Sequence, residues 1–412
     1  MYDVVIIGAG AAGVMCSLIL KKENHNLKVL LLEKNDKIGK KLSITGNGKC
    51  NLGNLDSNIS NYYSNSRLDS FKKLLENKNF DFLNVMDNTN DFDSYYNYLN
   101  NFGILIKEEE KRLYPYSMQA LSVCKSFERY LSFLNVEVRY GYDVKDVIMQ
   151  AGNFVINDEL ISKKVVVATG GKSYPKTGST GKGYEVLKEF GHTVTKLYPS
   201  LTSLKTDYKY IKDLAGVRAN AFVSLSVNGS VKETEEGQVQ FTKEALSGVC
   251  VFNLSINVSK YLDEKKTVKL IIDLVPEYSV YEIFEYLNSF PSYTVDEALS
   301  CVVNNKIAYV VAKEQGVYGK KVKALSKNEL EKVCFYLKNI YFNITGTGDF
   351  ESAQVTSGGV MLDEFTSGLE STKCKGLYAV GEVLDVAGKC GGYNLSWAFT
   401  SALVVAKDII KQ

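Results

Sequence analysis

The chain opens with a continuous apolar run at residues 2–7, which predicts a strand buried on both faces. Residues 11–22 then carry Val14, Leu18 and Ile19 at helical spacing, and residues 28–32 form a second apolar run. We therefore expect a strand, a helix and a second strand in direct succession. The connection between the first strand and the helix is short and rich in glycine.

Apolar residues mark further helices and strands along the first half of the chain. Residues 117–134 predict a helix with one apolar face, formed by Ala120, Cys124, Phe127, Leu131 and Leu134. Strand patterns follow at 136–140, 144–149, 154–156 and 165–168, so we expect a meander whose last strand rejoins a parallel sheet. The preceding asparagine-rich stretch predicts helix and loop, because apolar residues still recur at helical intervals, at Phe71, Leu74, Leu75, Phe82, Leu83 and Tyr95.

The pattern changes in the middle of the chain, which indicates an inserted domain. Alternation at residues 221–227 and 268–274 predicts antiparallel strands with one solvated face, and residues 280–287 and 295–311 predict helices. We expect this insertion to cover a substrate cleft. The predicted domains are 1–195 and 344–412 for a nucleotide-binding domain, 196–275 and 317–343 for a β-rich insertion, and 276–316 for a helical insertion.

The glycines after the first strand form the pattern G-x-G-x-x-G, at Gly8, Gly10 and Gly13. A tight turn requires the first glycine, close approach of a pyrophosphate to the backbone requires the second, and close packing of helix on strand requires the third. Glu33 ends the second strand 20 residues after Gly13 (33 minus 13), and its carboxylate can accept hydrogen bonds from ribose hydroxyls. The pattern therefore predicts a site for FAD or NAD, with the phosphates at the helix start near Ala11.

Two glycine-rich loops are candidates for the rest of such a site. Residues 42–54 are dense in glycine and asparagine, and Lys40, Lys41 and Lys49 add positive charge; a binding loop and a plain turn are equally compatible with them. The strand at 165–168 ends in Thr169-Gly170-Gly171, which either brings bare backbone to a cofactor or forms an ordinary turn.

A third candidate lies near the C-terminus, where an apolar strand at residues 376–380 ends in Gly381 and Glu382. Gly391 and Gly392 precede a long helix, whose apolar face comprises Leu395, Ala398, Phe399, Ala402, Leu403, Ala406, Ile409 and Ile410. Backbone donors at such a helix start would stabilise the negative charge of a reduced flavin. Alternatively, this block is only a strand and its covering helix.

Composition limits the other functions. The 412 residues have a formal net charge of +2, so we expect neither nucleic acid nor an anionic membrane as the main partner. Local basic patches are compatible with this net charge. A strand begins at the second residue and no apolar run approaches membrane-spanning length, so we expect a cytoplasmic protein. The eight cysteines form no C-x-x-C pair and the two histidines no metal-binding pattern, so we expect no metal and assign His192 to packing.

Several longer motifs resemble bacterial FAD flavoproteins related to aminoacetone oxidase and to the dehydro-bile-acid reductase. They span nearly the whole chain and comprise Gly8-Ala-Gly-Ala-Ala-Gly13, Thr45-Gly-Asn-Gly-Lys-Cys-Asn51, Arg112-Leu-Tyr-Pro115, Ala168-Thr-Gly-Gly-Lys-Ser-Tyr-Pro-Lys-Thr-Gly-Ser-Thr-Gly181, Ser357-Gly-Gly-Val360, Gly381-Glu-Val-Leu-Asp-Val-Ala-Gly388 and Gly391-Gly-Tyr-Asn394. The resemblance implies an α/β fold, with a glutathione-reductase-type, Rossmann-like FAD domain interrupted by a β-barrel-like unit and a small helical unit.

The same resemblance implies that FAD is the cofactor and which residues line it. These are Ala11, Ala12, Glu33, Lys34, Lys41, Gly46, Asn51, Val144, Glu382, Gly392 and Asn394, to which the glycine patterns add Gly8, Gly10, Gly13, Thr169, Gly170 and Gly381. The chain departs from the family at Lys49, Lys182, Phe241-Thr-Lys243 and Ser247-Gly-Val249, so the substrate cannot be transferred. No catalytic acid or base is assigned, although Arg112, Lys49 and Tyr393 are candidates to face the flavin.

Three functions follow as hypotheses. The first is an FAD-dependent oxidoreductase that transfers hydride through flavin N5 and reduces a small organic substrate at the expense of NAD(P)H. The segment 346–351 lacks the third glycine of a second dinucleotide motif, so NAD(P)H would dock transiently. The second is an oxidase of a small amine such as aminoacetone, with oxygen as acceptor. The third is a non-catalytic flavin-binding protein or a partner-dependent RNA-modifying one, against which the near-neutral charge argues.

Overall fold

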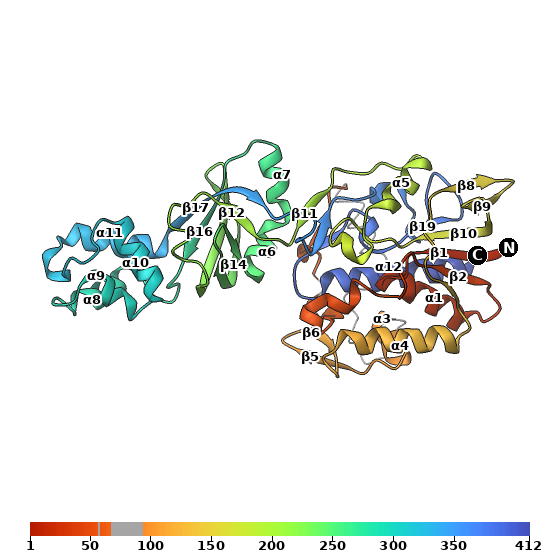
Figure 1. Cartoon of the computed structure of the whole chain (residues 1–412), viewed down its shortest axis with the longest axis horizontal. Helices are drawn as coiled ribbons and strands as arrows, with labels where there is room; N and C mark the ends of the chain where they lie inside the picture. The colour runs from red at the N-terminus through yellow and green to blue at the C-terminus, as the bar shows by residue number, and fades with distance from the viewer. Residues whose placement is uncertain (57, 67–93) are drawn as a thin grey trace. The chain divides into compact units, whose positions relative to one another are not determined.

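The computed structural model describes residues 1–56, 58–66 and 94–412. The chain forms two compact units (Figure 1). The first unit comprises Met1–Tyr198 and Gln354–Gln412, and the inserted unit comprises Pro199–Ala353. The helix and loop predicted from Phe71, Leu74, Leu75, Phe82 and Leu83 lie outside the described residues.

A seven-stranded sheet forms the centre of the first unit. Strand β1 (Tyr2–Ile7) runs parallel to both β2 (Val29–Leu32) and β10 (Leu160–Val167), and Val5 lies opposite Leu30 and Val165. The side chains of β1 are buried on both faces from Val4 onward, which explains why its sequence is apolar without alternation. The order is β7 (Glu137–Arg139), β2, β1, β10, β9 (Asn153–Ile156) and β8 (Val147–Gln150), and β19 (Leu377–Ala379) also pairs with β10.

The predicted meander and the returning strand are therefore confirmed, with shifted boundaries; the returning strand β10, for example, begins at Leu160 and not at Val165. Strand β8 begins at Val147, and Val144 precedes it as a buried loop residue. Strand β19 pairs in parallel with the end of β10, so the C-terminal block rejoins the sheet at the strand that itself pairs with β1.

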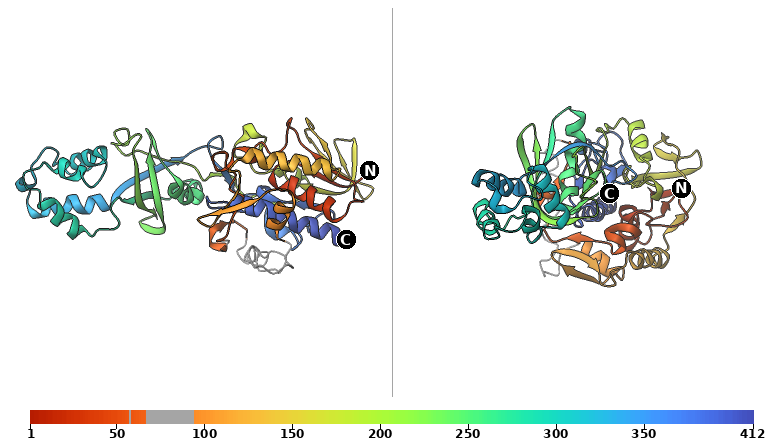
Figure 2. Two further views of the ribbon diagram at one scale, coloured as in Figure 1. Left: turned by 90° about the horizontal axis from the view of Figure 1, so that it is seen from below. Right: turned by 60° about the vertical axis from the view of Figure 1, so that its left-hand side comes forward.

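Helices α1 (Ala11–Glu23) and α12 (Tyr393–Lys411) pack against each other (Figure 2). Helix α1 is buried without interruption from Ala12 to Lys21, because it also contacts β1, β2 and α4. Helix α4 (Ala120–Phe133) buries only the face predicted from its spacing. The unit also contains α3 (Tyr95–Asn101), α5 (Lys182–Glu189), β3 (Gly53–Asn54), β4 (Tyr62–Tyr63), β5 (Ile106–Glu109), β6 (Arg112–Pro115), β18 (Val355–Ser357) and β20 (Ala387–Gly388), while β11 (Tyr198–Ser200) lies at its edge.

A closed six-stranded antiparallel barrel forms the core of the inserted unit. Its strands, in spatial order, are β12 (Leu204–Thr206), β15 (Ala245–Ser247), β14 (Ser230–Phe241), β13 (Arg218–Val227), β16 (Val268–Asp273) and β17 (Ile340–Thr347). Burial alternates along β16 and β17, which confirms the alternation predicted for the second of the two antiparallel segments. Because a closed barrel has no free edge strand, each strand finds its partners within the unit.

Helices complete the inserted unit. Short helices α6 (Val249–Leu254) and α7 (Val258–Asp263) lie against the barrel, and a helical part contains α8 (Val280–Asn288), α9 (Val295–Ser300), α10 (Asn305–Glu314) and α11 (Lys327–Lys338). Helix α11 falls within residues 317–343, which the sequence pattern placed in the β-rich insertion. Its start carries a capping box, in which Ser326 and Glu329 bond reciprocally.

Among the described helices, none combines the length and the apolar character that a membrane crossing requires.

Candidate functional site

The turn between β1 and α1 contains three glycines that meet three different constraints. Gly8 has φ +103°, and a Cβ atom on it would lie 2.7 Å from the carbonyl oxygen of Ala168. A Cβ atom on Gly13 would overlap the carbonyl oxygen of Gly8, so helix and strand could not approach as they do. At Gly10, by contrast, no described heavy atom lies within 4 Å of the Cβ position. The turn and packing roles predicted for the first and third glycines are thus seen directly, and the second glycine borders open space.

Glu33 lies at the end of β2 and is 8% exposed. Its Oε2 accepts a hydrogen bond from the backbone N–H of Ala9 at 2.9 Å, within the glycine turn. Its Oε1 accepts from the backbone N–H and the side-chain amide of Asn35, at 2.8 and 2.6 Å. A carboxylate has about four acceptor positions, and three of these are used by Ala9 and Asn35. One position is left, on Oε2, so Glu33 has room for one ribose hydroxyl and not for two.

The N-terminus of α1 has no side-chain cap. The first backbone N–H groups of the helix, including those of Ala11 and Ala12, therefore have neither an intrahelical acceptor nor a capping side chain. The C-terminal block reaches the same place. Gly381, with φ +71°, approaches so closely that a Cβ atom on it would lie 3.1 Å from Cβ of Ala12. Its N–H donates to Ser401 and its carbonyl oxygen accepts from the indole of Trp397, both at 2.9 Å and both from α12. The structure therefore brings together the two ends of the chain, as predicted.

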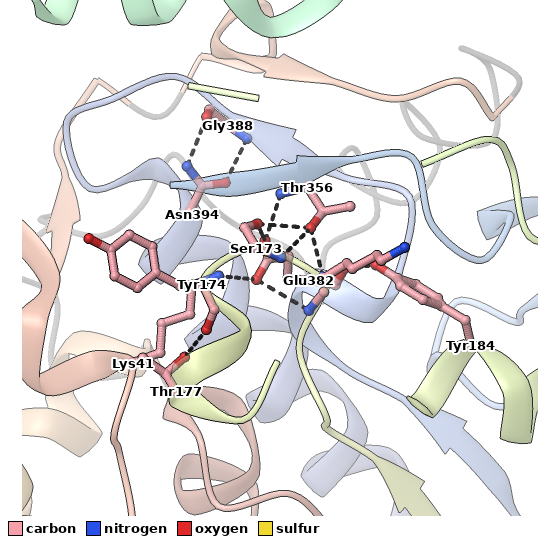
Figure 3. A network of polar contacts seen from close by, with 11 residues as sticks. Lys41, Ser173, Tyr174, Thr177, Tyr184, Thr356, Glu382, Gly388 and Asn394 are labelled. Carbon is pink, nitrogen blue, oxygen red and sulfur yellow. Dashed lines mark hydrogen bonds and ion pairs between the residues drawn. The ribbon is translucent and has the colours of Figure 1, made fainter. Parts of the chain in front are cut away.

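Glu382, the next residue, holds several separate segments together (Figure 3). Its Oε2 accepts from Nζ of Lys41 at 3.0 Å and from the N–H of Gly171 at 3.3 Å. Its Oε1 accepts from the N–H of Thr356 at 2.8 Å and from Oγ of Ser173 at 3.3 Å. With two donors on each oxygen, the acceptor capacity of this carboxylate is filled by the protein itself.

The partners of Glu382 are also bonded to one another. Oγ1 of Thr356 accepts from the N–H groups of Lys172 and Ser173, at 2.8 and 3.1 Å, and lies 2.9 Å from Oγ of Ser173. The carbonyl oxygen of Glu382 accepts from the hydroxyl of Tyr184 at 3.4 Å. Burial raises the pKa of Tyr184 well above its ordinary value, and the nearby carboxylates add to this, so Tyr184 remains a donor. Neither Thr356 nor Ser173 was singled out from the sequence, since nothing local indicates that they meet.

The glycine-rich loop at residues 42–54 contains the kinked 3-10 segment η1 (Leu42–Gly48), in which Gly46 and Asn47 have positive φ. The N–H of Cys50 closes the loop by donating to the carbonyl oxygen of Thr45 at 3.0 Å. Asn51 follows, and its Oδ1 is buried without a hydrogen-bond partner among the described residues. A buried amide oxygen without a donor is costly unless a ligand supplies one.

The start of α12 lies beside this amide. A Cβ atom on Gly392 would lie 2.6 Å from Oδ1 of Asn51 and would overlap the carbonyl oxygen of Gly53. Gly392 has φ +102° and caps α12 without a side-chain hydrogen bond, so the first backbone donors of the helix have no side-chain cap. The side chain of Asn394, in contrast, bonds both the N–H and the carbonyl oxygen of Gly388 at 2.8 Å (Figure 3). Asn394 therefore holds β20 to the helix, and only its backbone is left to face a ligand.

Thr169 and Gly170 follow β10 directly, and Gly170 has φ +72°. Oγ1 of Thr169 is a second buried polar atom with no hydrogen-bond partner within the part of the chain that the structure describes. A Cβ atom on Gly183 would overlap this oxygen, so α5 packs tightly on it.

The other predicted residues contact several different elements of the first unit. Nζ of Lys34 donates to Thr180 at 3.2 Å, and Val144 is buried in the loop that follows Tyr142, whose N–H donates to the carbonyl oxygen of Glu33. Arg112 lines an open, polar pocket of about 420 Å³ with Glu109, Glu110 and Tyr114, on the hairpin of β5 and β6. The ring of Tyr393 packs edge-on against Tyr62, and Lys49 is exposed.

His192 lies in a packed and hydrogen-bonded environment. His192 is buried, stacks on Phe365 and bonds Glu364 and Ser371 through its two ring nitrogens, at 3.1 and 2.7 Å. Burial lowers its pKa, and the packing role expected from the sequence agrees with these contacts. Within residues 1–56, 58–66 and 94–412, no group of three or more His, Cys, Asp or Glu side chains is placed to hold a metal ion.

One ionisable residue near the site was missed. Asp385 is 1% exposed and accepts from the N–H of Asn65 at 2.9 Å. Burial raises the pKa of its carboxyl to about 6, even though hydrogen bonds from Asn65, Thr195 and Ser66 lower it. It stands between the buried Leu384 and Val386, so a polar residue inside an apolar segment was the available signal.

The sheet, the glycine turn and the acid at the end of β2 define a Rossmann-type nucleotide-binding protein. Comparison with known families agrees with this class. Residues 2–408 match the family described as the HI0933-like protein Rossmann domain, and the chain belongs to this family.

Curated relatives match over almost their whole length. The chain is 30% identical over 419 residues to a 3-dehydro-bile acid delta(4,6)-reductase of Clostridium scindens, covering 99% of this chain and 98% of that protein. It is 29% identical over 429 residues to a ribosomal RNA dihydrouridine synthase of Haemophilus influenzae, with the same two coverages. Solved structures that it resembles include a 3-ketosteroid delta1-dehydrogenase from Sterolibacterium denitrificans, at 12% identity and a TM-score of 0.47, covering 100% of this chain and 99% of that one.

Proposed function

We propose that this chain uses FAD to reduce an activated carbon–carbon double bond of an organic substrate, with NAD(P)H as the electron donor. It is an FAD-dependent oxidoreductase. The observation that carries the proposal is a pair of helix starts without side-chain caps, at Gly10 and at Gly392. The Cβ position of Gly10 borders open space, and at Gly392 there is no room for a Cβ atom beside Asn51 and Gly53. One suits a pyrophosphate and the other suits the anionic edge of a reduced flavin.

The residues at these two places fit FAD rather than a smaller nucleotide. The glycine turn, Glu33 and the α1 start suit the adenosine and pyrophosphate, which FAD and NAD share. A second set comprises Asn51 and the start of α12 at Gly392, which are 341 residues apart in sequence (392 minus 51). The unpartnered amide oxygen of Asn51 and the unpartnered hydroxyl of Thr169 are two polar atoms that a larger cofactor would satisfy.

The chemistry that FAD supplies is hydride transfer through flavin N5. The chain's own residues bind and orient. Lys41 and the donors around Glu382 fix the Gly170–Gly171 turn against the C-terminal block, and the start of α12 offers backbone donors to negative charge. Reduction of the double bond adds this hydride to one carbon and a proton to the other.

The names of two kinds of relative support the choice of reaction. One is named as a reductase of a delta(4,6) compound and the other as a synthase of dihydrouridine, and both names describe the addition of hydrogen to a double bond. We infer the same reaction type here. Transient docking of NAD(P)H is consistent with Gly346, which lies within barrel strand β17 and not at a turn between a strand and a helix.

Anaerobic mixing of the FAD-loaded enzyme with NADPH or NADH tests the proposal, followed by addition of an enone or of air. We expect the flavin to be bleached by one nicotinamide and reoxidised faster by the enone than by oxygen, without peroxide. Stoichiometric peroxide with aminoacetone as reductant would support the amine oxidase instead. A flavin that stays oxidised with every donor would support the non-catalytic or partner-dependent alternative.

A further inference from the structure

Arg112 has a half-buried side chain whose guanidinium group forms no hydrogen bond or ion pair within the described part of the chain. It lines a pocket of about 420 Å³, which we call the Arg112 pocket, together with Glu109, Glu110 and Tyr114. Arg139, likewise half-buried, forms ion pairs with glutamates at 3.0 and 3.5 Å. A guanidinium group carries several donors and stays charged in proteins, so an unpaired one in a pocket suits an acceptor oxygen of a ligand.

The strand pairing places Arg112 beside the start of α12. In the antiparallel pair of β3 and β6, Arg112 lies directly opposite Asn54, so their side chains lie on the same face. The side-chain amide of Asn54 donates to the carbonyl oxygen of Gly391 at 2.9 Å. Gly391 precedes Gly392, at which α12 begins without a side-chain cap. Arg112 is therefore next to the residue that holds the loop where we propose that the flavin edge lies.

The charges around the Arg112 pocket favour a neutral ligand. Glu109 is already paired with Lys107, at 2.6 Å. This bond lowers the pKa of Glu109, and the charge of Lys49 from the glycine-rich loop adds to the effect, so Glu109 stays ionised. A phosphate or carboxylate in the pocket would be repelled by Glu109 and Glu110, whereas a neutral carbonyl group can accept from Arg112 without that repulsion.

We propose that the Arg112 pocket binds the carbonyl group of the substrate, with the guanidinium group donating to its oxygen. This inference rests on the proposed function and names an α,β-unsaturated carbonyl compound as the substrate class. When a hydride with its two electrons adds to the β carbon, the π electrons move onto the carbonyl oxygen, and a proton from the solvent then adds to the α carbon. The hydride comes from the reduced cofactor, which is thereby oxidised. Arg112 acts as a catalytic residue, because its positive charge stabilises the negative charge that develops on the oxygen.

Rapid mixing of the full-length, FAD-loaded protein separates the two halves of the reaction. The protein is reduced with NADPH, and in a parallel sample with dithionite, and is then mixed anaerobically with cyclohexenone while the flavin absorbance is followed. We expect Arg112→Gln to slow reoxidation by the enone at least about 100-fold and to leave the rate of reduction by NADPH within about twofold. Arg112→Lys keeps the charge without the forked donors and should slow reoxidation about tenfold.

Lys111→Gln is the matched control. It removes a positive charge from an exposed position of the same hairpin that does not line the pocket, so both half-reactions should stay within about twofold. Binding of cyclohexanone, the reduced product, gives a readout without turnover when it is titrated into the oxidised protein and the flavin spectrum is recorded. Its dissociation constant should rise at least about tenfold in Arg112→Gln and stay within about twofold in Lys111→Gln.

Other outcomes would overturn the proposal. Unchanged reoxidation in Arg112→Gln would mean that the guanidinium group does not touch the substrate. Slower reduction by NADPH with unchanged reoxidation would place the nicotinamide carboxamide in the pocket instead. Equal losses in Arg112→Gln and Lys111→Gln would reduce the effect to net charge.

Flavin absorbance and the thermal unfolding midpoint, measured on each variant, confirm that it folds. Failure of the proposed function would appear separately, as an unmodified, dithionite-reduced protein that the enone does not reoxidise. The cyclohexanone titration then decides on the pocket by itself, because unchanged binding in Arg112→Gln would overturn the proposal and weakened binding would support it.

Discussion

The backbone N–H of Ala9 donates a hydrogen bond of 2.9 Å to Oε2 of Glu33. This bond ties the glycine turn after β1 to the end of β2 before any cofactor is bound. The acid of the dinucleotide pattern therefore has two roles, since it fixes the turn as well as offering an acceptor to a ribose. A variant at Glu33 would disturb both, which makes the glycines themselves the cleaner test of the site.

Gly13→Ala and Gly10→Ala should separate folding from cofactor binding. At Gly13 the added Cβ atom overlaps backbone, so we expect the apoprotein to lose about 3 kcal/mol of unfolding free energy. At Gly10 the Cβ atom meets no described atom and φ is −79°, so the apoprotein should change by less than about 0.5 kcal/mol. Its affinity for FAD should nevertheless fall at least about tenfold, because the methyl group occupies the space that the pyrophosphate needs.

Denaturant titration of the apoprotein and fluorescence titration with FAD measure the two quantities. A Gly10→Ala protein with unchanged FAD affinity would mean that the cofactor does not approach this turn. Loss of FAD binding only through loss of folding would lead to the same conclusion.

Thr169→Val should stabilise the apoprotein and weaken the holoprotein. It removes a buried hydroxyl that has no partner among the described residues, so we expect a gain of about 1 kcal/mol without FAD. If FAD satisfies this hydroxyl, its affinity should fall about tenfold. Thr202→Val is the matched control, since Oγ1 of Thr202 is also buried without a described partner but lies in the inserted unit. It should show a similar gain in stability with unchanged FAD affinity, and equal losses of affinity in both variants would contradict the assignment.

Glu382→Gln should loosen the connection between the C-terminal block and the turn at Gly171. An amide offers one acceptor oxygen where the carboxylate accepts from four donors, so we expect a loss of about 2 kcal/mol in stability. Lys41→Met leaves three of the donors in place and should cost less than about 1 kcal/mol, with the cost falling as salt rises. Chemical unfolding of the apoprotein at two ionic strengths measures both. A larger effect for Lys41→Met would mean that the ion pair, and not the network, holds the segments.

Asp385→Asn should change the pH dependence of stability in a defined direction. The pKa of Asp385 is raised from 3.8 to about 6 in the folded protein, so its ionised form is the less stable one there. Stability from this group is complete below about pH 4 and is lost as pH rises through 6, a difference of about 3 kcal/mol. The variant cannot ionise and should gain on the unmodified protein by about that amount between pH 4 and 7. Urea titrations across this range test it, and a difference between the two proteins that does not change with pH would show that Asp385 is ionised without penalty.

Much of the first unit could be predicted from the sequence, because its strands and helices are marked by patterns within a single short segment of the chain. Apolar runs bounded by turns predicted β1, β2 and β10, and helical spacing predicted the buried face of α4. The three glycines could be assigned separate roles, because each role follows from the missing Cβ atom alone.

The rest depends on contacts between distant segments. Nothing near Thr356 or Ser173 indicates that they meet Glu382, since these residues come together only when β10, β18 and the C-terminal block are assembled. Likewise, the family resemblance implied a cofactor contact for Asn394, but its side-chain amide bonds the backbone of Gly388. The barrel was expected only from the family resemblance and is confirmed; alternation alone could not predict its closure, because it gives the buried face of a strand and not its neighbours.

The most direct test of the account is the flavin content of the purified protein, measured by its absorption spectrum and by release of the nucleotide on denaturation. We expect a yellow protein that carries about one FAD per chain, or an apoprotein that takes up one FAD with quenching of its fluorescence. A folded, colourless protein that takes up no FAD would contradict it.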